Sequence, residues 1–152
     1  MLTLNFKVQD QNVGLLFALS AFNNFLARIF SPRLSSRGGE RMEALLGSSL
    51  ISLSNLIFSF APNLLTIGLG MIIYGLGFGF FIPASISITG KTVPDEHKAL
   101  GMALFTTVTD FGVFLGSLIS PFFLIHFGFP AIFLFSFILA LLGLVIQMNF
   151  KF

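Results

Sequence analysis

The sequence contains no cysteine and no tryptophan, and only 9% of its 152 residues are charged. Without cysteine the chain can form neither disulfides nor thiolate metal sites, and it has no cysteine nucleophile. A soluble domain carries roughly 25% charged residues, so the charged groups here are too few to cover a water-soluble globule. With 55% hydrophobic residues, 22 of them phenylalanine, and a mean hydropathy of +0.97, the composition predicts an integral membrane protein.

Side chains that catalyse reactions or bind metals are also scarce. The chain has six carboxylates and two histidines, and five of the carboxylates lie in or beside polar flanking segments. These residues form no Ser/His/Asp set, no metal-ligand cluster and no phosphate-binding loop. The eight basic residues form no stripe and accompany no nucleic-acid motif. We therefore expect no enzyme, no metal, no cofactor and no nucleic-acid partner.

Five segments are long and apolar enough to cross a membrane as helices, which takes about 20 residues each. Turn residues such as Pro62, Pro94 and Gly128 separate them. The segments are longer than barrel strands and do not alternate in polarity. The sequence therefore predicts an all-α integral membrane protein with a five-helix domain at residues 13–149. Its spans lie at about 13–30, 43–60, 64–88, 99–124 and 130–148.

The basic residues are divided unevenly between the two sides of this domain. Short connections make successive helices antiparallel, so the connecting segments alternate between the two sides. One side has only Lys7, and the other has Arg28, Arg33, Arg37, Arg41, Lys91, Lys98 and Lys151. Because cytoplasmic loops are enriched in Lys and Arg, we expect residues 1–12 outside and the tail 150–152 in the cytoplasm. The expected location is a plasma membrane, bacterial in origin.

One carboxylate, Asp110, lies inside a predicted span. It is eleven residues into the fourth span, and a helix rises about 1.5 Å per residue, so Asp110 lies near the midplane of the membrane. A carboxylate there costs on the order of 3 kcal/mol and normally faces a bundle interior or a water-filled route. Two explanations stay open. Asp110 is either a structural group held by Thr106 or a neighbouring helix, or a functional group that carries a proton, binds a cation or makes a gating contact.

Small residues mark faces that we expect to pack against other helices. In a membrane, helices associate through close approach at small residues and through interhelical hydrogen bonds. Gly75 and Gly79 of the third span lie four residues apart, as do Gly112 and Gly116 of the fourth. Both pairs predict packing ridges.

Polar residues mark two further faces. Asn23 and Asn24 lie in the middle of the first span and point about 100° apart, so one is expected to pack and the other to face a cavity; which does which stays open. The second span has one polar face, which either hydrogen-bonds another helix or lines a wet cavity. Its members are Ser48, Ser52, Asn55 and Ser59.

The segment after the first span resembles a known motif. Residues 28–41, Arg-Ile-Phe-Ser-Pro-Arg-Leu-Ser-Ser-Arg-Gly-Gly-Glu-Arg, are similar to the cytoplasmic loop motif G-x-L-A-D-R-x-G-R-R of the major facilitator superfamily. Leu34, Arg37, Gly39 and Arg41 take the Leu, Arg, Gly and final basic positions. The first Gly and the Asp of the motif are replaced by Pro and Ser, which suggests the degenerate copy found in the C-terminal half of these proteins.

Two later segments extend the resemblance. Residues 70–79, Gly-Met-Ile-Ile-Tyr-Gly-Leu-Gly-Phe-Gly, look like the fourth helix of a six-helix half. Residues 110–117, Asp-Phe-Gly-Val-Phe-Leu-Gly-Ser, are similar to the fifth helix of a half in bacterial drug- or sugar-efflux-type members. The resemblance implies spans eight to twelve of a twelve-helix transporter, with residues 1–12 as the tail of a missing helix or its outer loop.

The resemblance also implies a function and partners. The complete protein would be a secondary active transporter that exports a drug- or sugar-like small molecule in exchange for protons by alternating access. Its partners would be membrane lipid, the substrate, and either the missing N-terminal half or further copies of the chain. The cavity candidates are Asp110, Thr106, Asn23, Asn24 and Asn55, and the cytoplasmic gating candidates are Arg33, Arg37, Gly39 and Arg41. The alternative is a small non-transporting membrane protein that acts through helix–helix interaction.

Overall fold

The computed structural model describes residues 10–149, and all regular structure in this range is helical. Four α-helices, α2 (Asp10–Ser59), α3 (Leu64–Thr92), α4 (Lys98–Phe127) and α5 (Phe129–Asn149), are joined by short turns and one 3-10 segment, η1 (Asp95–His97). The expected all-α membrane fold is confirmed, because each of the four α-helices is long and apolar enough to cross a membrane. Lys7, most of the predicted N-terminal segment and the tail 150–152 lie outside the described residues.

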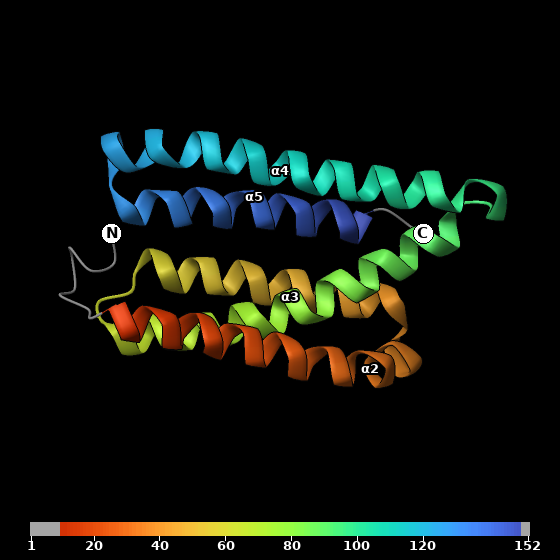
Figure 1. Ribbon diagram of the computed structural model, residues 1–152, viewed down its shortest axis with the longest axis horizontal. Coiled ribbons are helices and arrows are strands. Elements are labelled where there is room, and N and C mark those ends of the chain that lie inside the picture. Colours follow the sequence, from red (N-terminus) through yellow and green to blue (C-terminus); the bar gives the residue numbers. More distant parts are fainter. Residues whose placement is uncertain (1–9, 150–152) are drawn as a thin grey trace.

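The number of helices differs from the prediction, since four membrane-length helices replace the expected five. The first two predicted spans and the loop between them form the single 50-residue α2, in which only Gly39 has non-helical backbone angles (φ 78°, ψ 159°). The chain reverses there, and the first arm (residues 10–38) and second arm (residues 40–59) run in opposite directions (Figure 1). The predicted loop residues 31–42 are therefore helical on both sides of one glycine.

The connections lie at two ends of the bundle. The Gly39 turn lies at the same end as the connection from α3 through η1 to α4, while the α2–α3 and α4–α5 connections lie at the opposite end (Figure 1). The turns follow local chemistry. Asn63 caps α3 by accepting a hydrogen bond from the Thr66 N–H at 2.9 Å, and Gly128 ends α4 with a positive φ of 80°.

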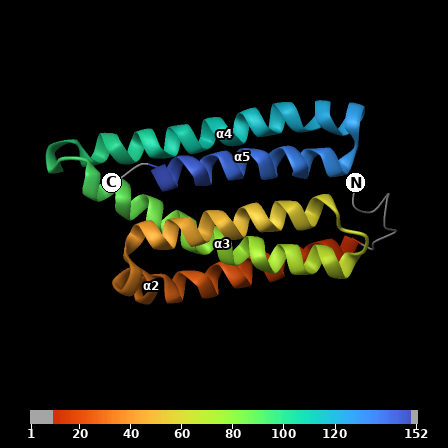
Figure 2. The ribbon, with the colours of Figure 1, turned by 180° about the vertical axis from the view of Figure 1, so that it is seen from behind.

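The helices are arranged in a fixed order across the bundle. The two arms of α2 and α3 form one group, α5 packs against the second arm, and α4 lies outermost beside α5, as both views show (Figures 1 and 2). A small core of Leu16, Phe58 and Ile67, with Phe133 of α5 packed on it, joins these elements near the turn at residues 60–63. The Phe58 and Phe133 rings lie 5.1 Å apart.

The outermost helix, α4, has no buried residue, in contrast to α3. It touches α5, for example through the stacked rings of Phe123 and Phe135 at 4.7 Å, and it meets the end of α3. Most of its apolar side chains are open to the surroundings. These faces are free for lipid or for further helices.

Candidate functional site

Asp110 and Thr106 lie on the exposed part of α4. The Thr106 hydroxyl donates to the backbone oxygen of Met102 at 2.6 Å, one turn earlier on the same helix. It therefore does not hold Asp110. Within residues 10–149 the Asp110 carboxylate has no salt-bridge partner, since the two ion pairs there involve other acids. The carboxylate faces open space beside the bundle.

The three asparagine candidates are half-buried in α2 and bond within their own helix. Asn23 donates to the Leu19 backbone oxygen at 2.8 Å, and Asn55 donates to that of Ile51 at 3.0 Å. Asn24 accepts from the Arg28 Nε at 2.9 Å. These residues lie in the group of helices farthest from α4 (Figure 1). The structure thus does not bring Asn23, Asn24 and Asn55 together with Asp110.

Gly75 and Gly79 lie in close contact with the first arm of α2. A Cβ added at Gly79 would come within 2.6 Å of the Ala27 Cβ and of the Asn24 backbone oxygen, and one at Gly75 would meet the Ser20 backbone oxygen. Both asparagines of the first arm contribute to this contact, because the Cβ of Asn23 also approaches Gly75. Such close approach lets the helix backbones pack directly.

The glycines of α4 have a different environment. A Cβ added at Gly112 or Gly116 would meet nothing within 4 Å. Both residues line an open groove of about 400 Å³ between α4 and α5, whose walls include Ser120 and Ser136. No described helix fills this groove.

The polar face of the second arm contacts α5. Ser59 donates to the Pro130 backbone oxygen at 3.1 Å. The Ser48 hydroxyl lies 3.0 Å from the Gln147 Oε1 and 2.9 Å from the Ala44 backbone oxygen of its own helix. Ser48 and Ser59 are both buried. Ser48 and Ser59 thus lie against α5, whereas Asn55 bonds its own helix and the Ser52 hydroxyl has no partner within residues 10–149.

The turn at Gly39 is fastened to two other helices. Glu40 accepts from the Lys91 ammonium at 2.6 Å and from the Ser87 hydroxyl at 2.5 Å, both on α3. These two bonds, the one from Lys91 foremost, hold the pKa of the Glu40 carboxyl below its ordinary value. Arg41 donates to the Met148 backbone oxygen of α5 at 2.8 Å.

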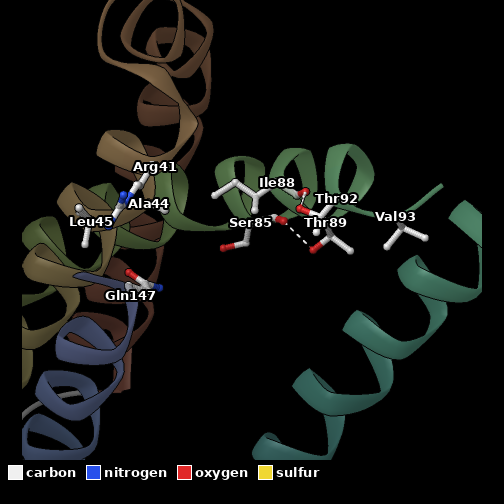
Figure 3. Close-up of a pocket in the computed structure, with 9 residues that line it drawn as sticks. All are labelled: Arg41, Ala44, Leu45, Ser85, Ile88, Thr89, Thr92, Val93 and Gln147. Carbon is white, nitrogen blue, oxygen red and sulfur yellow. Dashed lines mark hydrogen bonds between the residues drawn. The ribbon is translucent and has the colours of Figure 1, made fainter. Parts of the chain in front are cut away.

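The other two arginines of this segment, Arg33 and Arg37, are exposed. Arg41 alone of the three predicted gating arginines bonds another helix within the described range. It also lines a cleft of about 320 Å³ between the second arm, α3 and α5 (Figure 3). The cleft residues are Arg41, Ala44, Leu45, Ser85, Ile88, Thr89, Thr92, Val93 and Gln147, and they include none of the midplane candidates.

Sequence reasoning did not single out Glu40 and Glu43. Glu40 makes the salt bridge to Lys91, and Glu43 is only 1% exposed. The sequence does contain a pattern that could have identified them, because Glu40, Glu43 and Gly47 follow the i, i+3, i+7 spacing of one helix face. In the structure, Gly47 packs directly on Phe81 and Gly77 of α3. That spacing places both acids on the face of the second arm that meets α3.

Comparison with known proteins places these features in a family. A family model described as Major Facilitator Superfamily matches residues 1–151. Relatives include the Major facilitator superfamily multidrug transporter mfsC of Aspergillus fumigatus, which is 27% identical over 97% of this chain and 28% of its own length. The Gentisate transporter of Corynebacterium glutamicum is 31% identical over 78% of this chain and 26% of its own length.

A third relative, the Quinolone resistance protein NorA of Staphylococcus aureus, is 24% identical over 69% of this chain and 27% of its own length. The chain thus spans just over a quarter of the length of these three relatives. The printed names describe two of these relatives as transporters and the third as a resistance protein. On the match over almost its whole length, the chain belongs to the Major Facilitator Superfamily.

Proposed function

We propose that this chain supplies five consecutive spans of a secondary active transporter that exports a small organic molecule in exchange for protons. The two arms of α2 and the helices α3, α4 and α5 would be these spans, and the rest of the transporter would come from a part of the protein that precedes them. The names of the relatives mention drugs, quinolones and gentisate. A drug-like substrate is therefore our working choice, and the resemblance of residues 110–117 to drug- or sugar-efflux-type members adds a sugar-like one.

The observation that carries the proposal is the open carboxylate of Asp110. It lies in mid-helix on α4, exposed and without a salt-bridge partner among residues 10–149. A charged group at that depth is costly unless it faces water or a partner. In a transporter the binding and coupling sites lie near the midplane between two halves. The absent half would form the second wall of a cavity that Asp110 borders.

The charge distribution supports an orientation for this transporter. The Gly39 turn and the connection at residues 93–97 carry or adjoin the basic residues and lie at one end of the bundle (Figure 1). By the positive-inside tendency this end faces the cytoplasm. The bonds of Glu40 and Arg41 at this end would then tie the cytoplasmic ends of three helices, as a gate between inward- and outward-facing states requires.

A cysteine accessibility scan tests whether the Asp110 face borders a watery cavity. The 152 residues contain no native cysteine. Once any cysteines in the rest of the protein are replaced, single cysteines at Thr106, Asp110 and Ser117 can be compared with cysteines at Val108 and Phe111 on other faces of α4. In the complete transporter we expect a membrane-impermeant thiol reagent to modify the first three and to spare the last two. Equal or absent modification of all five would contradict the cavity.

A flux assay separates the transporter from the non-transporting alternative. We expect the 152-residue chain alone to move no substrate across vesicle membranes and the complete protein to do so. Lack of flux by the complete protein with a panel of drug- and sugar-like compounds under a proton gradient would favour a protein that acts only through helix–helix interaction.

A further inference from the structure

The side chain of Glu43 is a buried carboxyl group to which the proposed function assigns no role. It is 1% exposed, and its Oε1 has no hydrogen-bond partner within residues 10–149. Buried polar atoms are almost always hydrogen-bonded. A buried carboxylate that lacks a full set of partners therefore needs an explanation, and no step of the proposed transport cycle uses it.

The neighbours of Glu43 do not neutralise it. The Ser31 hydroxyl of the first arm lies near its carboxyl group, and Glu40 adds a like charge one turn earlier. The nearby basic groups are engaged elsewhere: Lys91 of α3 with Glu40, and Arg41 with α5. On the first arm, Arg28 bonds Asn24.

Glu43 lies next to a hinge in the backbone. Gly39, four residues before it, has the positive φ at which the arms of α2 reverse direction. Ser31, on the other arm, is also buried at 6% exposure. Ser31 and Glu43 thus lie near each other on opposite sides of the hinge, at the corner between the two arms.

The face that carries Glu43 packs on α3. Gly47, one turn later, lies against Gly77 and Phe81, and the antiparallel register brings Ala84, itself 1% exposed, level with Glu43. The side chains of Glu43 and Ala84 are therefore both almost inaccessible to solvent. A neutral carboxylic acid can remain there at modest cost, whereas an unpaired carboxylate requires water or a cation.

We propose that Glu43 is a proton-operated latch: as the neutral acid it keeps the two arms of α2 closed on α3, and as the carboxylate it opens this corner at the Gly39 hinge. The latch is separate from Asp110 and does not depend on the chain being a transporter. It connects proton loss at one buried side chain to the movement of the turn that carries Arg37, Glu40 and Arg41.

Infrared spectroscopy tests the protonation state directly. Asp110→Asn removes the exposed acid of α4, which would face lipid in a nanodisc. Glu43 is then the one acid buried by the protein within residues 12–149. We expect a protonated carboxylic acid band at neutral pH that persists with Glu40→Gln and disappears with Glu43→Gln. Absence of the band at neutral pH in the Asp110→Asn chain would overturn the proposal without relying on any change at Glu43.

Thiol labelling tests the opening. An Ala84→Cys substitution places a reporter in the closed corner, and Ser36→Cys provides an exposed control at which the pH dependence of the thiol itself is measured. We divide the labelling rate of the cysteine at position 84 by that of the cysteine at position 36. If opening releases one proton from Glu43, this ratio rises about tenfold per pH unit over the range in which Glu43 titrates. With Glu43→Gln we expect a ratio that does not change with pH.

Two results would contradict the latch. One is a labelling ratio in the parent chain that does not change with pH, a measurement that requires no variant at Glu43. The other is an unchanged rise in the Glu43→Gln chain, provided that its helical content matches the parent by circular dichroism. The Glu40→Gln chain is the matched control, because it removes the neighbouring salt bridge and leaves the buried acid in place.

Discussion

Single glycines distinguish the closely packed faces of this bundle from the open ones. Gly79 lies where an added Cβ would come within 2.6 Å of Ala27 and Asn24, whereas Gly112 has nothing within 4 Å. The same residue type therefore has opposite tolerance to substitution at the two positions. The difference comes from the backbone separation of the neighbouring helices.

Substitution of these glycines is a direct test. We expect Gly79→Val to lower the free energy of unfolding by about 1–3 kcal/mol, because overpacking forces the first arm of α2 away from α3. In the isolated chain Gly112→Val is expected to leave stability nearly unchanged. Unfolding in mixed micelles followed by circular dichroism measures both, and equal effects of the two substitutions would argue against the close contact between α2 and α3.

The salt bridge between Lys91 and Glu40 is expected to contribute little to stability. The Lys91 side chain is 70% exposed, and exposed pairs are worth about 0.2–1 kcal/mol. Lys91→Gln should therefore lower the unfolding free energy by no more than this, and high salt should abolish the difference. A loss several times larger would mean that the pair holds the turn more tightly than its exposure implies.

The kink within α2 determines how its two arms meet. Gly39 has a φ of 78° and a ψ of 159°, a backbone conformation that is essentially restricted to glycine and costs another residue about 1–3 kcal/mol. We expect Gly39→Ala to lower the unfolding free energy by this amount. Gly14→Ala is the control, since Gly14 lies in regular helix with open space around it. If both substitutions have the same effect, the glycine-specific backbone conformation does not form at Gly39.

The contact between α2 and α5 depends partly on interhelical hydrogen bonds. Ser59→Ala removes the bond to the Pro130 backbone oxygen, and such bonds in membranes average about 0.6 kcal/mol. We expect a loss of this size on unfolding in micelles. Ser136→Ala serves as the control, because that hydroxyl bonds its own helix at Ile132. A larger loss in the control would place the stabilising contact elsewhere.

The sequence predicted the helices well and the first connection poorly. Apolar length identified every membrane-length helix, but Pro32 and the serines around it suggested a loop where the backbone continues as helix up to Gly39. A single glycine suffices to reverse the chain, so the other turn-forming residues need not break the helix. Glu43 was overlooked because it stands at the start of an apolar run, where a charge is ordinarily a flanking group.

At the scale of the whole molecule, α4 explains why the site could be predicted only in part. Sequence spacing identified Asp110 and its face, but it contains no information about the other wall of a cavity. The structure places Asn23, Asn24 and Asn55 in a different group of helices from Asp110 (Figure 1). The chain spans just over a quarter of the length of three relatives, and the residues opposite Asp110 would come from the remainder.

Proton-coupled flux in vesicles that contain the complete transporter measures whether Asp110 carries the coupling proton. We predict that Asp110→Asn abolishes substrate-driven proton movement while insertion and helical content remain normal. Asp95→Asn is the matched control, because Asp95 is an exposed acid in η1 and its replacement should leave coupling intact. Unchanged proton-coupled flux in the Asp110→Asn protein would contradict the account and assign Asp110 to structure alone.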